Sequence, residues 1–154
     1  MFPKPSPDGI ALSIQDITAQ WPEDWKGTFD YVHQRLGLAG IGQHPLKDIV
    51  HRQCELLKPG GWIEFVELDI APNSNPAVEK LFSLVRELID MIGNGWNYVS
   101  TLKGALEQAG LESVEDKSID VFLGASASSP ELREKSIISM QFTTSAFVDV
   151  VDSK

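Results

Sequence analysis

The stretch Leu57-Lys58-Pro59-Gly60-Gly61-Trp62-Ile63-Glu64-Phe65-Val66-Glu67 decides the fold that we expect for this chain. Its Lys-Pro-Gly-Gly segment is typical of a helix stop followed by a turn. The run from 62 to 70 is rich in β-forming residues and is bounded by Gly-Gly and Pro72, which favours a buried strand. Before it, apolar residues from Pro45 to Leu57 follow helical spacing. We therefore predict a helix followed at once by a strand.

The flanking sequence continues the alternation of strands and helices. A proline-rich lead-in at 1–9 precedes predicted strands at 10–17 and 29–33, and a further strand is predicted at 113–123. Capping residues and apolar stripes predict helices at 76–92 and 98–109 and from 130 onward, with Gly93-Asn94-Gly95 ending the first. The tail at 142–151 is ambiguous. This order predicts one α/β domain over 1–154, with parallel strands and right-handed crossovers.

Composition narrows the possible partners and location. The chain has 154 residues, 42% of them hydrophobic, which is enough for one core. A net charge of −9 argues against nucleic acid or an anionic membrane as partner. The sequence shows no signal peptide and no bilayer-spanning apolar run. Its single cysteine, Cys54, cannot form an internal disulfide and fits a reducing compartment. We expect a soluble cytoplasmic protein without a membrane or nucleic-acid partner.

Four motifs occur in a fixed order: Asp16-Ile17, Trp21-Pro22, Phe29-Asp30-Tyr31-Val32-His33-Gln34-Arg35 and the Pro-Gly-Gly turn. Together they resemble the class I S-adenosylmethionine-dependent methyltransferases, most closely the branch of fungal secondary-metabolite clusters. The resemblance covers roughly residues 2–140. The glycine-rich cofactor loop of that family and the acidic residue that ends its second strand have no counterpart here. The resemblance therefore implies an incomplete Rossmann-like methyltransferase sheet flanked by helices, lacking the first two strands.

The resemblance also assigns roles to particular positions. It places Asp16 against the adenine of the cofactor, if S-adenosylmethionine binds; the alternative is that Asp16 only forms a turn. It places a substrate pocket near the carboxyl ends of two strands and beyond the long helix. The candidate substrate-binding residues are Tyr31, Gln34, Asp69, Trp96, Asn97 and Tyr98. Trp96, Asn97 and Tyr98 could equally close the core.

Three residues are candidates for catalysis. His33 is the best acid or base because an unperturbed histidine titrates near physiological pH; the alternative is a structural histidine bonded to backbone. Arg35 could orient an anionic or carbonyl-bearing substrate, or pair with a surface carboxylate. Glu67 could transfer protons together with Asp69, or both could be solvated at a strand end. We predict no metal site, because the histidines at 33, 44 and 51 lack metal-ligand spacing.

Three functions remain open. The first is a small-molecule tailoring enzyme of natural-product biosynthesis that needs no cofactor and acts as a cyclase or isomerase by positioning and acid/base help. The second is a fragment of a methyltransferase, which would use S-adenosylmethionine. The third is a non-catalytic subunit that completes or regulates a full-length methyltransferase. Since an incomplete sheet has unpaired strand edges, we also predict a homodimer through those edges.

Overall fold

The structure is a computed structural model that describes residues 6–93 and 95–152, with side chains described up to residue 145. The chain divides into two compact units, the first ending at Glu115 and the second beginning at Asp116. The prediction of one domain over 1–154 stays a prediction. Asn94 and the first five residues of the lead-in lie outside the described residues.

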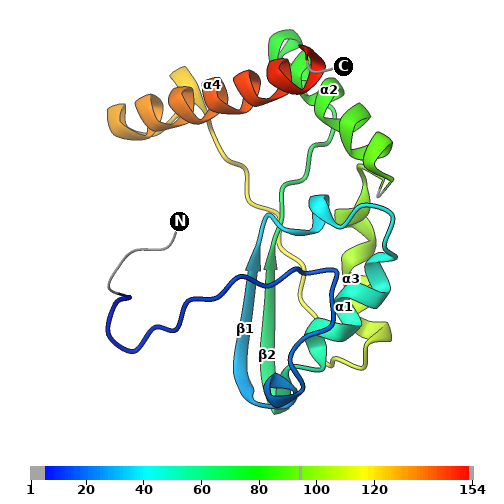
Figure 1. The fold of residues 1–154 in the computed structure, drawn as a ribbon. Coiled ribbons are helices and arrows are strands. Elements are labelled where there is room, and N and C mark those ends of the chain that lie inside the picture. Colours follow the sequence, from blue (N-terminus) through cyan, green and yellow to red (C-terminus); the bar gives the residue numbers. More distant parts are fainter. Residues whose placement is uncertain (1–5, 94, 153–154) are drawn as a thin grey trace. The chain divides into compact units, whose positions relative to one another are not determined.

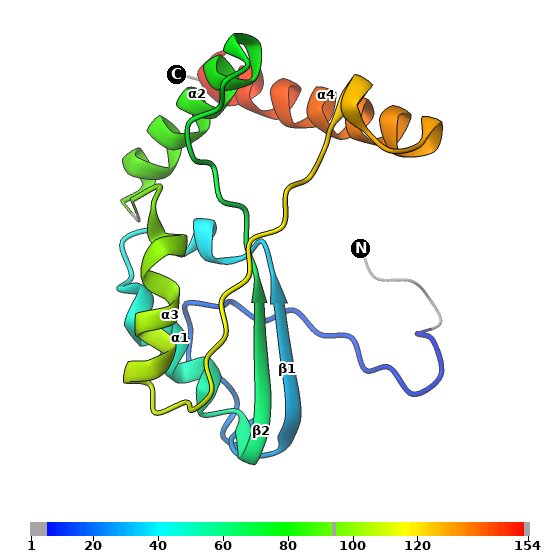
Figure 2. The same ribbon diagram turned by 180° about the vertical axis from the view of Figure 1, so that it is seen from behind.

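The first unit contains a parallel pair of strands. Strand β1 (Phe29–Arg35) pairs with β2 (Leu57–Val66), and α1 (Leu46–Cys54) connects them. A short 3-10 helix, η1 (Glu23–Trp25), precedes β1, and another, η2 (Leu38–Gly40), follows it. Figures 1 and 2 show α1 on one side of the two strands. The prediction of parallel strands with a helical crossover is confirmed, and the α/β arrangement fits an incomplete Rossmann-like sheet.

The Lys-Pro-Gly-Gly segment forms a bulge within β2. Phe29 pairs with Leu57, but Tyr31 pairs with Trp62, so the register shifts between these two positions. Gly60 has φ +80°, which favours glycine, and a Cβ on Gly61 would meet the carbonyl oxygens of both strands at 3.0–3.2 Å. Strand β2 thus begins at Leu57 and ends at Val66, not at the predicted 62–70.

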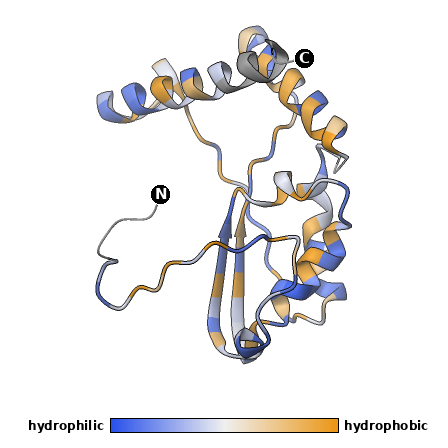
Figure 3. Cartoon of the chain, in the orientation of Figure 1, coloured by the Kyte–Doolittle hydropathy of each residue, from blue (hydrophilic) through white to orange (hydrophobic). Residues whose placement is uncertain are grey.

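The core of this unit lies between the strands and two helices. Helix α3 (Tyr98–Gln108) packs on α1, and both lie on the same side of the strands in Figures 1 and 2. Apolar and polar residues alternate along much of both strands (Figure 3), so that one face packs on the helices and the other is open. The buried members of the core are Leu38, Ile41, Ile49, Val50, Tyr98, Leu102 and Ala105.

Helix α2 (Pro76–Ile92) has the boundaries that the sequence predicts. The Asn75 side chain accepts hydrogen bonds from the Ala77 and Val78 amides at 3.0 and 3.4 Å and so caps the first turn. Gly93 ends the helix in the left-handed conformation at φ +105°. Helix α3 likewise matches its prediction within one residue.

Two predicted strands are wrong. Residues 10–17 and 113–123 form no strand, although both carry β-forming residues. A strand is stabilised by a hydrogen-bonded neighbour, and within the described residues neither segment has one. Their apolar side chains are accordingly exposed, for example Ile14 at 91% and Val121 at 75%.

The second unit consists mainly of one long helix. After a 3-10 turn, η3 (Gly124–Ser126), helix α4 runs over Pro130–Asp152 and includes most of the ambiguous tail. The Gly124 amide donates to Ser136 Oγ at 2.9 Å and so joins the turn to the helix. Among the described residues, no helix combines the length and apolarity needed to cross a bilayer.

Candidate functional site

The open face of the two strands carries a cluster of three polar side chains. In the parallel register His33 lies opposite Glu64, and Tyr31 lies two residues before His33 on the same face. His33 Nδ1 is 2.8 Å from Glu64 Oε2, and the Tyr31 hydroxyl donates to the same oxygen at 2.6 Å. The Tyr31 and His33 rings stack with their centroids 6.4 Å apart. Two predicted site residues are thus joined through a carboxylate that the prediction missed.

The hydrogen bonds of this cluster favour an ionised Glu64. The donation from Tyr31, followed by that from His33, lowers the pKa of the Glu64 carboxyl. The same contact raises the pKa of the Tyr31 hydroxyl, because a nearby carboxylate disfavours tyrosinate. A carboxylate on Nδ1 fixes the imidazole with its proton on that nitrogen, which leaves Nε2 as an acceptor. His33 can therefore act as a general base.

Glu67 forms a second polar cluster just beyond the end of β2. Its Oε1 accepts hydrogen bonds from the Gly37 amide at 3.0 Å, the Leu38 amide at 3.1 Å and Gln34 Nε2 at 3.3 Å. Its Oε2 accepts from the buried Tyr98 hydroxyl at 3.0 Å. Burial and this carboxylate raise the pKa of Tyr98 far above its ordinary value. The structure thus joins three predicted site residues, Glu67, Gln34 and Tyr98, in an arrangement that holds the loop after β1.

A buried glutamine extends this cluster into helix α1. Gln53 is 2% exposed and donates from Nε2 to Gln34 Oε1. Sequence reasoning missed this residue, because helical spacing marks Gln53 only as a position on the buried face of α1. Its partner Gln34 is one of the half-buried β1 residues whose side chains face the helices.

A pocket of about 210 Å³ lies beside β1 in the first unit. Its lining comes from β1, from the end of α1 and the residues just after it, and from the segment before β1. The full lining is Ile17, Trp21, Val32, His33, Gln34, Gln53 and Leu56. Because Val32 and Gln34 alternate with His33 along β1, this small, mostly apolar pocket lies on the helix side of the strands, and the His33 imidazole lies on the open face.

The remaining predicted residues lie apart from this pocket. Arg35 is exposed at the end of β1, and Asp69 is exposed and accepts the Ala71 amide at 3.1 Å. The Arg86 guanidinium lies over the Trp96 ring, and the distance from Arg86 Cζ to the ring centroid is 5.7 Å. Asn97 is exposed at the start of α3, and its side chain forms no capping hydrogen bond. Nothing in the structure tests the roles predicted for these side chains.

The position that the resemblance places against the cofactor, Asp16, forms a turn in this structure. The Asp16 carboxylate is exposed and accepts from the Thr18 amide and hydroxyl, both at 2.8 Å. These bonds lower the Asp16 pKa and make it a turn former. In the glycine-rich loop after β1, a Cβ on Gly37 would meet the Gln34 side chain at 3.0 Å. The space that a Cβ on Gly37 would occupy is therefore needed by the Gln34 side chain.

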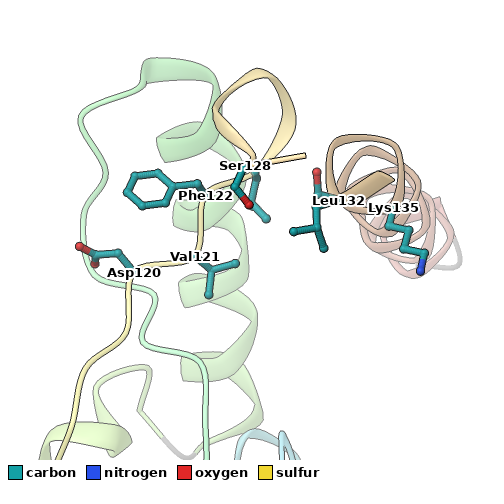
Figure 4. Close-up of a pocket in the computed structure, with 8 residues that line it drawn as sticks. Asp120, Val121, Phe122, Ser128, Leu132 and Lys135 are labelled. Carbon is teal, nitrogen blue, oxygen red and sulfur yellow. The ribbon is translucent and has the colours of Figure 1, made fainter. Parts of the chain in front are cut away.

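The second unit has a shallow cavity of about 450 Å³ of its own. Figure 4 shows Leu132 of α4 across from Val121 and Phe122 of the preceding coil. No predicted site residue lines it. Within the described part of the chain no group of three or more metal-binding side chains comes together, either.

Comparison with known proteins relates the chain to fungal methyltransferases. It is 36% identical over 139 residues to methyltransferase psoC of Aspergillus fumigatus. The matched region covers 89% of this chain and 50% of psoC. It is also 36% identical over 129 residues to N-methyltransferase sirN of Leptosphaeria maculans, covering 80% of this chain and 45% of sirN. With N-methyltransferase gliN of Aspergillus fumigatus the identity is 29% over 140 residues, covering 86% of this chain and 50% of gliN. No family model matches the chain. No solved structure matches it either.

These relatives confirm the resemblance predicted from the motifs. The parallel strands with their helical crossover and the shared sequence make the chain a homologue of the methyltransferases of fungal secondary metabolism. The chain spans about half the length of the curated relatives it matches.

Proposed function

We propose that this chain forms the acceptor side of a natural-product methyltransferase, the part that binds a small molecule and removes a proton from the atom to be methylated. The observation that carries the proposal is the Tyr31–Glu64–His33 cluster on the open face of β1 and β2. The relatedness to methyltransferases, several of them named as N-methyltransferases, supports the reaction class. Methyl transfer itself is supplied by S-adenosylmethionine in that family.

The chemistry of the cluster is proton transfer. With its Nδ1 proton shared with Glu64, His33 presents Nε2 to a substrate N–H or O–H at the open face of the strands. Nε2 takes the proton, the bond electrons stay on the substrate atom, and the imidazolium is stabilised by the adjacent carboxylate. Tyr31 donates to the same carboxylate and restricts its orientation. Each of these steps uses only side chains of this chain.

The same cluster supports a second candidate, a cofactor-free cyclase or isomerase. Such an enzyme moves a proton on a bound intermediate without a methyl group. The observation that favours it is that the described residues provide a candidate base and a cavity, whereas Asp16, the position assigned to the cofactor, accepts hydrogen bonds from Thr18. Under this second candidate no cofactor is needed.

We also propose that the open sheet edge takes a protein partner. Within the described residues β1 pairs only with β2, and the exposed face carries Trp62, 65% exposed, and Tyr31, 54% exposed. A two-stranded parallel sheet is rarely stable with an uncovered face and edge. A second copy of the chain is the partner that the sequence predicts, and a full-length methyltransferase that the chain completes or regulates is the alternative. Light scattering that gives a monomer at micromolar concentration would refute the homodimer.

The test of function is a calorimetric titration of the folded chain with S-adenosylmethionine and S-adenosylhomocysteine. Micromolar binding supports the methyltransferase proposal. No binding by protein with a native circular dichroism spectrum retires methyl transfer for this chain and leaves cofactor-free proton transfer. In either case His33→Gln should abolish turnover of candidate natural-product intermediates. The matched control His51→Gln, on the exposed face of α1, should retain it.

A further inference from the structure

Two residues that line the pocket at β1 carry buried polar atoms that lack partners. Trp21 Nε1 and Gln53 Oε1 are each shielded from solvent, and neither has a hydrogen-bond partner within the described residues. Both residues line the same pocket. Buried polar atoms are nearly always paired in folded proteins. Two unpaired atoms around one cavity therefore point to a group that enters it and bonds to both.

The hydrogen bonds that start at Glu67 determine which atom of the Gln53 amide is left to bond a ligand. A carboxylate can only accept, so Gln34 must turn its amide nitrogen towards Glu67 Oε1, at 3.3 Å. Gln34 Oε1 then accepts from Gln53 Nε2. The atom left over on Gln53 is its oxygen, an acceptor, whereas Trp21 Nε1 can only donate. The occupant must therefore donate one hydrogen bond and accept another.

The other walls limit the charge of the occupant. Ile17, Val32 and Leu56 are apolar, and neither Gln53 nor Trp21 carries a charge. An ion placed there would be desolvated without a counter-charge, which is costly. The pocket therefore suits a neutral molecule with an apolar body and one group that is both donor and acceptor. A hydroxyl is the smallest group that meets both demands.

We propose that this pocket binds neutral hydroxyl-bearing small molecules, with the hydroxyl donating to Gln53 Oε1 and accepting from Trp21 Nε1. The inference goes beyond the proposed function: this pocket lies on the helix side of β1, whereas the candidate base His33 lies on the open face. Binding itself needs neither a cofactor nor turnover.

Three probes of similar size test the proposal. Phenol can make both hydrogen bonds, anisole can only accept from Trp21, and toluene can make neither. In a nitrogen-15 NMR titration, phenol should shift the Trp21 Nε1–H resonance and bind about tenfold or more tightly than anisole, because anisole leaves Gln53 unpaired. Anisole should in turn bind more tightly than toluene.

Two variants separate the two bonds. Gln53→Met keeps length and volume, and should make phenol and anisole bind within about twofold of each other. Trp21→Phe should lower the affinity for anisole to that for toluene, while phenol still binds more tightly than either. This second variant keeps the proposal testable if Gln53→Met does not fold. Trp62→Phe, on the open sheet face, is the matched control and should not change the affinity for any of the three probes.

The proposal is overturned by any of three results: equal binding of the three probes, binding of none at millimolar concentration, or an ordered water as the only partner of the two atoms. Because binding is read without catalysis, a failed cofactor titration leaves it unaffected.

Discussion

Replacing Glu67 tests whether this carboxylate holds the fold or performs chemistry. Its two oxygens accept from four donors: the amides of Gly37 and Leu38, the amide nitrogen of Gln34 and the hydroxyl of Tyr98. In Glu67→Leu all four lose this acceptor. In Glu67→Gln one oxygen remains for the loop amides, and the Tyr98 hydroxyl can rotate to accept from the new amide.

The size of the effect follows from these contacts. A buried donor left without an acceptor costs about 1–3 kcal/mol, and the four costs are not additive because water reaches the part-buried groups. We expect Glu67→Leu to lower the free energy of unfolding by about 3 kcal/mol. Glu67→Gln, which loses only the strengthening due to charge, should cost about 1 kcal/mol.

Urea unfolding followed by circular dichroism measures both values. The matched control is Asp69→Asn, since the Asp69 carboxylate is exposed and, among the described residues, accepts only the Ala71 amide. This control should change stability by less than about 0.5 kcal/mol. The reasoning is refuted if Glu67→Leu is as stable as the wild type. If Glu67→Gln instead retains full stability and loses turnover, Glu67 acts in catalysis, as the sequence predicts.

Four further predictions concern two glycines, a tyrosine and the cysteine. Gly61→Ala should destabilise the chain by about 1–3 kcal/mol, because its Cβ would lie 3.0–3.2 Å from backbone carbonyl oxygens. Gly104→Ala, inside helix α3 with nothing within 4 Å of the new Cβ, should stabilise it by up to about 1 kcal/mol in the same urea assay. Glu64→Gln should let Tyr31 titrate closer to its ordinary pKa of 10.0, seen as tyrosinate absorbance at lower pH than in the wild type; an unchanged titration would contradict the contact. Burial raises the Cys54 pKa from 9.0 to about 11, so alkylation at pH 8 should be about 100-fold slower than in the urea-unfolded chain; equal rates by mass spectrometry would rule out this burial.

Local signals in the sequence were enough to predict the helices. Asn75 and Gly93 mark the two ends of α2 through hydrogen bonds and a backbone angle that involve only neighbouring residues. The strands at 10–17 and 113–123 failed because alternation shows only that a segment could form a strand. A strand also needs a neighbour, and the described residues supply one only to β1 and β2.

The candidate site was predictable only in part, for a related reason. His33 and Tyr31 could be identified from their residue types and from the resemblance, but their partner Glu64 depends on the register between two strands. Glu67 lies at the predicted edge of the sheet, yet its four donors come from the loop after β1, from β1 itself and from α3. Contacts between segments so far apart in the sequence follow from the fold.

The Lys-Pro-Gly-Gly segment links the family resemblance to the chemistry. Between Phe29 and Tyr31 strand β1 advances two residues, whereas its partner positions advance from Leu57 to Trp62, which is five residues. The bulge therefore absorbs three extra residues and sets the register in which His33 lies opposite Glu64. A slip of one residue would exchange the two faces of β2 and place an apolar side chain beside the imidazole. Gly60 and Gly61 allow this bulge, one through its positive φ and the other through its close approach to the carbonyl oxygens of both strands. The same glycines that mark the family in the sequence thus set the geometry of the candidate base.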